Sequence, residues 1–194
     1  MQRVTRYQWL LVVMHWLMAL LVPIALAGGA LVLVKIPNTD PSKIEALRQH
    51  MAGGTLLLAL MLIRWVVRVR TAHPARASTG NSVLDSVAWL SHRLIYVLVL
   101  GQAFTGIYLA MQADLPDIVF GGHGALPADF WVFPMRSVHY VISRLLMAVI
   151  ALHVAGALYH TFFLRDGLLR RMWFGRSLLR SPDSVVPARG QPLS

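Results

Sequence analysis

Four long apolar segments constrain the fold of this chain more than any other feature. The first, Trp9–Val34, contains no charged residue, and the second runs from 49 to 67 with only Arg64 inside it. The third and fourth include charge-free stretches at 94–113 and 145–164. A helix needs about 20 mostly apolar residues to cross the hydrocarbon core of a bilayer. We therefore predict an all-α integral membrane four-helix bundle, with helices at about 9–34, 49–67, 87–112 and 138–164.

The composition excludes the main alternatives to a membrane fold. Of the 194 residues, 57% are apolar and only 13% are charged, whereas about a quarter of the residues in a typical soluble domain are charged. A disordered chain is excluded because it requires few apolar residues. The first apolar run is also longer than the roughly 7–15 residues of a signal-peptide core, so we read it as a retained helix.

The positive charges predict how the bundle lies in the membrane. The chain has 18 Lys and Arg against 8 Asp and Glu, and these basic residues flank the apolar segments, which favours membrane topology over nucleic-acid binding. Thirteen of these basic residues fall on one side of the predicted membrane: at the N-terminus, between the second and third helices, and after the fourth helix. Four fall on the other side. Cytoplasmic loops carry the excess of Lys and Arg. We expect both termini to be cytoplasmic, with a transmembrane domain at 1–173 and a basic, poorly ordered tail at 174–194.

Histidines on the predicted helices form the candidate site. His139 and His153 are 14 residues apart, which is about 40° short of four helical turns and about 21 Å along the axis. They therefore share one face at two depths. By the same rise per residue, His15 lies roughly 13 Å and His153 about 18 Å from the cytoplasmic charges, while His50 and His139 both begin helices at the outer side. These depths predict that His15 pairs with His153 and that His50 pairs with His139.

Two facing imidazoles are suited to the axial positions of haem iron held between helices. The chain has no cysteine, which excludes thiolate zinc sites, cysteine-ligated iron–sulfur clusters and covalent haem attachment. A four-histidine zinc site is disfavoured because the two levels are about 21 Å apart. Two alternatives stay open: the histidines could only bond helices together, or His160 could replace His153 as a ligand.

Other residues could contact such a cofactor. His92 lies at the inner end of the third predicted helix, where it could meet a haem edge or a quinone. Arg64 and Arg144 lie within predicted helices, where each could pair with an anionic haem propionate; contact with lipid headgroups is the alternative. We assign no catalytic side chain.

Several motifs, in this order and spacing, resemble the bacterial cytochrome b561 family. They are Met14-His15-Trp16-Leu17, Gln49–Gly54, Leu62–Trp65, Ser91–Tyr96, Thr105-Gly106, Val138-His139, and the most specific stretch, Ala151–His160 followed by Leu164–Met172. Each is weak alone, and together they span roughly 6–173.

The resemblance implies a multi-pass protein of the bacterial inner membrane that carries two haem b groups. His15, His50, His139 and His153 match the family's ligand positions. Family members move electrons between a donor and quinone, and one branch looks like superoxide oxidase, which oxidises superoxide at the outer face and reduces ubiquinone. Other relatives are anchor subunits that connect quinone to a hydrogenase- or dehydrogenase-type redox partner. The nearly neutral outer connections fit an anionic substrate poorly unless basic residues cluster there. A structural, non-redox protein is the third reading.

Overall fold

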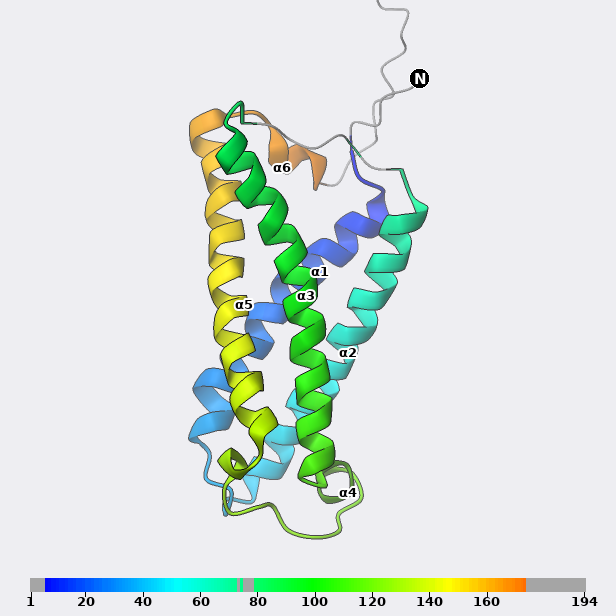
Figure 1. Ribbon diagram of the computed structural model, residues 1–194. Coiled ribbons are helices and arrows are strands. Elements are labelled where there is room, and N and C mark those ends of the chain that lie inside the picture. The colour runs from blue at the N-terminus through cyan, green and yellow to red at the C-terminus, as the bar shows by residue number, and fades with distance from the viewer. Residues whose placement is uncertain (1–5, 73, 75–78, 174–194) are drawn as a thin grey trace, which may run out of the picture.

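The computed structural model describes residues 6–72, 74 and 79–173, and this part of the chain is helical without strands. Four helical segments are long and apolar enough to cross a membrane (Figure 1). The first is α1 (Trp9–Ala27), which continues through a π-helical turn, η1 (Gly28–Val32), and a 3-10 turn, η2 (Leu33–Lys35). The others are α2 (Ser42–Arg70), α3 (Ser82–Gln112), and α5 (Pro134–Tyr159) with its π-helical end η4 (His160–Leu164). The predicted membrane four-helix bundle is confirmed.

Three of the four segments begin several residues before their predicted starts. At the start of α2, Lys43 is buried, and its ammonium donates hydrogen bonds to the carbonyls of Leu33 (2.7 Å) and Ile36 (2.8 Å). Lys43 thus caps the end of the first segment. The polar start of α2 is therefore helical although it resembles a loop in sequence. At the start of α3, the Asn81 side chain accepts hydrogen bonds from the amides of Val83 and Leu84, which is a typical N-cap.

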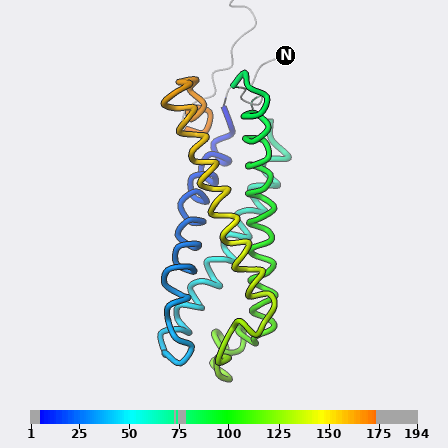
Figure 2. Tube along the Cα trace, turned by 60° about the vertical axis from the view of Figure 1, so that its left-hand side comes forward, coloured from blue at the N-terminus to red at the C-terminus, as the bar shows by residue number. Residues whose placement is uncertain are grey.

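The helices pack as neighbours around a narrow apolar interior. Most of the packing runs between α3 and α5, with α1 against α2 and α2 against α3 (Figures 1 and 2). One buried cluster lies within the bundle and consists of Met18, Val22, Met61, Val99 and Leu146. A second cluster joins α2 and α3 to the short helix α4 (Leu115–Val119) and consists of Leu47, Ala110, Ala113, Leu115 and Val119.

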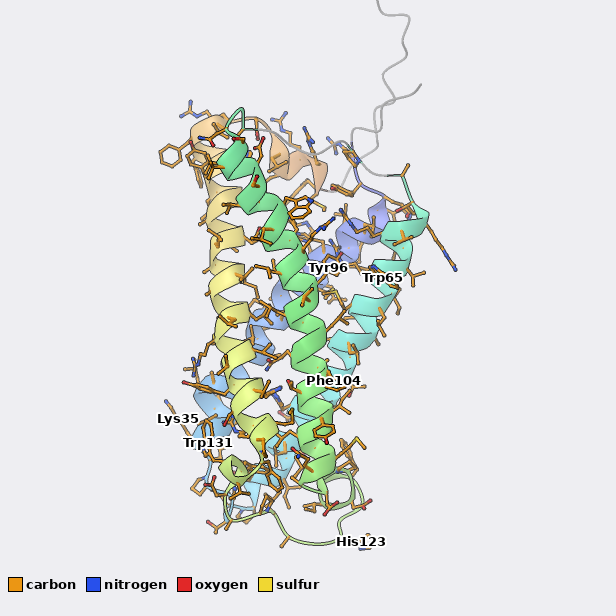
Figure 3. All side chains as sticks on the ribbon, in the orientation of Figure 1. Lys35, Trp65, Tyr96, Phe104, His123 and Trp131 are labelled. Atoms are coloured by element: carbon orange, nitrogen blue, oxygen red, sulfur yellow. The ribbon has the colours of Figure 1, made fainter. Side chains whose placement is uncertain are left out.

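The outer surface of the bundle is apolar. Large hydrophobic side chains are exposed along all four long segments, among them Leu20, Trp65, Phe104 and Phe163 (Figure 3). Apolar exposure on this scale marks a surface that meets lipid or protein rather than water. Together with the span lengths, it fits a multi-pass membrane protein.

Both ends of the described chain lie at the same end of the bundle, and α4 lies at the opposite end (Figure 1). The Tyr7 amide donates to the Arg171 carbonyl (3.2 Å), and the Trp16 indole N–H donates to the Met172 carbonyl (2.7 Å). These bonds tie the short helix α6 (Leu168–Arg171) and the residues after it to the start of α1. The predicted basic tail at 174–194 lies outside the described residues.

Candidate functional site

The four singled-out histidines come together in two pairs. His15 on α1 faces His153 on α5, with 6.4 Å between the ring centroids and 74° between the ring planes. His50 on α2 faces His139 on α5, with 6.2 Å between the centroids and 80° between the planes. These are the pairs expected from helical periodicity and depth.

The backbone approaches the His50–His139 pair closely at two glycines. A Cβ atom added to Gly29 would lie 3.2 Å from His50 Cε1, and one added to Gly106 would lie 3.1 Å from His139 Cε1. Both separations are shorter than ordinary van der Waals contact. A side chain at either position would therefore press on an imidazole ring.

Three glycines that follow His50 and His153 in sequence behave differently. A Cβ on Gly53, Gly54 or Gly156 would meet no described atom within 4 Å. Glycine at these three positions therefore leaves room beside the helix backbone, instead of relieving a crowded contact.

His92 on α3 approaches the His15–His153 pair. Its ring centroid is 4.8 Å from that of His153, and its Nδ1 lies 2.6 Å from the Ala88 carbonyl oxygen. A carbonyl oxygen only accepts hydrogen bonds, so the proton of a neutral His92 resides on Nδ1. The sequence placed His92 at the inner end of its helix but did not reveal this contact with His153.

Arg64 is the charged group nearest the same pair. Its side chain is buried, donating from Nη1 to the Leu11 carbonyl (2.8 Å) and from Nε to the Tyr96 hydroxyl (3.1 Å). Figure 3 labels Tyr96 in the half of the bundle nearer the termini. Arg64 thus joins α1, α2 and α3, and it lies close enough to His15 and His153 to act on both electrostatically.

At the α4 end, Arg136 is the basic residue that acts electrostatically on both His50 and His139. Its guanidinium lies 4.5 Å from the centroid of the Trp131 ring, and Lys43 is near enough to interact with it. Arg144 is exposed and stacks over the Tyr140 ring at 4.8 Å, and none of its described contacts reaches a histidine pair. Arg48 is held by Glu45 and by the Val119 carbonyl.

His160 and Asp166 form a second polar centre at the end that carries α6. His160 is buried, and its Nδ1 lies 2.6 Å from Asp166 Oδ2. Burial raises the pKa of the Asp166 carboxyl, but hydrogen bonds from His160 and the Leu168 amide outweigh it, so the pKa stays below its usual value. The loop residue His123 lies at the opposite end (Figure 3), and His73 lies outside the described residues.

Two residues of α3 touch His139: Thr105, which the sequence pointed to only as part of the Thr105-Gly106 motif, and Gln102, which it did not single out. Gln102 Nε2 lies 2.9 Å from His139 Nε2, and Thr105 Oγ1 lies 3.1 Å from His139 Nδ1. Neutral polar residues in an apolar helix have many roles, so their type alone carried no signal. Only the packing of α3 along α5 reveals them.

Comparisons with known proteins agree with this architecture. Residues 6–175 match a family described as prokaryotic cytochrome b561. A probable superoxide oxidase, CybB, from Yersinia pestis is 25% identical over 172 residues, which is 86% of this chain and 95% of the relative. Cytochrome b561 homolog 2 from Escherichia coli K12 is also 25% identical, over 86% of this chain and 90% of its own length. The chain therefore belongs to the prokaryotic cytochrome b561 family of membrane b-type cytochromes that transfer electrons.

Proposed function

We propose that the chain holds two haem b groups, one ligated by His15 and His153 and the other by His50 and His139. The observation that carries the proposal is the spacing of the two pairs, 6.4 and 6.2 Å between ring centroids. An imidazole nitrogen lies about 2 Å from a bound transition metal. Adding about 1.2 Å from that nitrogen to the ring centre, two imidazoles on opposite sides of one iron have centroids about 6.4 Å apart. Both pairs match this separation.

The surroundings of the pairs also fit the cofactor. Four imidazoles and no cysteine make a donor set typical of non-covalent haem. Gly53, Gly54 and Gly156 leave room beside helix backbones, as a flat macrocycle requires. For the propionates we propose Arg64 and Arg144 as partners. Arg64 has the stronger support, because Arg144 stacks on Tyr140 instead.

We propose superoxide as the electron donor, at the His50–His139 end. The positive charge of Arg136, which acts on both histidines and has Lys43 as a basic neighbour, attracts an anion, although the connecting loops are nearly neutral. The name of the relative CybB supports the same donor. Each of two superoxide anions gives up one electron and becomes O₂.

We propose ubiquinone as the acceptor, at the other end of the bundle. One quinone takes the two electrons and two protons and becomes quinol. The bound haems supply reversible one-electron storage between the two ends. The hydrogen-bonded His160–Asp166 pair, with a buried imidazole and an exposed carboxyl, lies at the end where the quinone would be reduced. Residues 1–173 would form this functional unit and 174–194 a basic tail.

The orientation follows from the charges. The end that carries both described chain ends also holds Arg6, Arg68, Arg70 and the basic residues of α6. We propose that this end faces the cytoplasm of the bacterial inner membrane, because positive charge is retained on that side. Superoxide would then be oxidised outside and protons taken up inside.

Stopped-flow spectroscopy of the purified full chain tests the proposal. We expect superoxide to reduce the haem and added ubiquinone to reoxidise it. His50→Ala should abolish the rapid reduction of haem by superoxide. If the wild-type chain is reduced only when a hydrogenase- or dehydrogenase-type subunit is present, the chain is an anchor subunit, and the superoxide assignment is wrong. A colourless purified chain would favour the non-redox reading.

A further inference from the structure

Thr105 forms an unusual contact with His139. Its side chain is buried, at 4% exposure, and its Oγ1 lies 2.8 Å from the Gly101 carbonyl and 3.1 Å from the Gln102 carbonyl, both on its own helix. A hydroxyl has a single proton, and these carbonyls can only accept it. The Thr105 lone pairs therefore remain for His139 Nδ1, at 3.1 Å. This arrangement assigns the imidazole proton to Nδ1, which donates a hydrogen bond to Thr105 Oγ1.

Gln102 lies at the other nitrogen of the ring. Its Nε2, a donor, lies 2.9 Å from His139 Nε2, an arrangement that agrees with a lone pair on His139 Nε2. Gln102 Oε1 is the one buried side-chain oxygen or nitrogen without a hydrogen-bond partner in the described part of the chain. The amide is thus only half satisfied, and the tautomer assignment rests on Thr105.

The contact is confined to one histidine of the four. Among the described residues, His15, His50 and His153 make no side-chain hydrogen bond, whereas His139 has a partner at each ring nitrogen. A change at Thr105 therefore reaches one ligand of one pair directly. Metal-ligating histidines typically donate their second N–H to such an acceptor, which fixes the tautomer and raises the basicity of the ligand.

We propose that Thr105 is a positioning residue for the haem of the His50–His139 pair. By accepting a hydrogen bond from His139 Nδ1–H, it would fix the tautomer that leaves the Nε2 lone pair for the iron, and it would make the imidazole a stronger donor. A stronger donor favours ferric over ferrous iron and lowers the midpoint potential of that haem. This inference rests on the ligand assignment proposed above.

The test compares Thr105→Val, which keeps the shape and removes the hydroxyl, with Thr105→Ser, which keeps the hydroxyl. The readouts are haem content per chain and the midpoint potential of each haem, measured by spectroscopic redox titration of the full chain. We expect Thr105→Val to raise one potential, leave the other unchanged and weaken retention of that haem by about 10–100-fold. Thr105→Ser should stay close to wild type in both readouts.

Thr55→Val is the matched control. The Thr55 hydroxyl makes the same kind of bond to the carbonyl four residues earlier, that of Met51 at 2.9 Å, but contacts no histidine. It should change neither potential. If Thr105→Val loses one haem outright, the helical content is intact and Thr105→Ser keeps both haems, the proposal is supported.

The proposal is overturned if Thr105→Val keeps two haems at wild-type potentials, or if Thr105→Ser behaves like Thr105→Val. His139→Ala separates this failure from failure of the ligand assignment. If His139→Ala retains both haems, the assignment itself is wrong. If His139→Ala loses one haem and Thr105→Val leaves both potentials unchanged, only the role of Thr105 is refuted.

Discussion

The His15–His153 and His50–His139 pairs have nearly the same spacing, but their surroundings differ. Near His15 and His153 lie a buried arginine, Arg64, and a third imidazole, that of His92. The other pair has hydrogen-bonding partners on His139 and two glycines packed against its rings. The helix geometry thus makes the pairs alike, and the neighbouring side chains make them different. One bundle thus places two histidine pairs of similar geometry in different chemical surroundings.

Removing one histidine should have the largest effect and should separate the two pairs. We expect His50→Ala to lose the haem of its own pair and to keep the other, because each iron loses an axial ligand only where its histidine is removed. His15→Ala should give the reverse result. Haem content per chain and redox titration measure both. Loss of both haems from a folded His50→Ala chain would contradict independent sites.

Arg64→Leu should have the next largest effect, concentrated on the His15–His153 side. The substitution removes two hydrogen bonds from a charged donor, to the Leu11 carbonyl and to the half-buried Tyr96 hydroxyl, at a cost of about 1.5–3 kcal/mol each. Loss of the positive charge should also lower the potential of the nearer haem. Thermal unfolding in detergent and redox titration measure the two effects. Arg70→Leu, an exposed arginine on the same helix, is the control and should change neither.

The apolar spans could be predicted from the sequence because a run of about 20 apolar residues is typical of a membrane-spanning helix and rare in other structures. The histidine pairs could also be predicted, since a spacing of 14 residues repeats the helical period. The early start of α2 was missed because Lys43 and Glu45 resemble loop residues, although Lys43 caps the preceding segment. The contacts of Thr105 and Gln102 with His139 could not be predicted, because the type of a neutral polar residue in an apolar helix does not reveal which side chain it faces.

Gly106→Ala should have a moderate effect on the His50–His139 side. The new Cβ would lie 3.1 Å from His139 Cε1, so the ring must shift. We expect weaker haem retention, by up to about tenfold, and a changed spectrum for one haem. Gly101→Ala is the control on the same helix, because its Cβ would meet only Ile142 Cδ1 at 3.5 Å, an ordinary contact. Identical haem content and spectra in the two variants would refute the crowding argument.

The smallest effect should come from acid acting on the His160–Asp166 pair. The pKa of Asp166 is lower in the folded chain than its usual value of 3.8. Its contribution to stability is therefore complete above that value and is lost as the pH falls through the lower folded pKa. We expect the protection of the α6 amides, measured as the exchange rate relative to the intrinsic rate at each pH, to decrease under acid, because the Leu168 amide donates to Asp166. Asp166→Asn should show much less dependence on pH; an equal dependence would contradict this assignment.

The most direct test of the central claim is the haem content of the purified chain, measured together with a reduced-minus-oxidised spectrum. The account predicts two low-spin b-type haems per chain, because each histidine pair supplies two axial ligands. A single haem per fully reconstituted chain, or no low-spin signal, would contradict the assignment of both pairs as ligands.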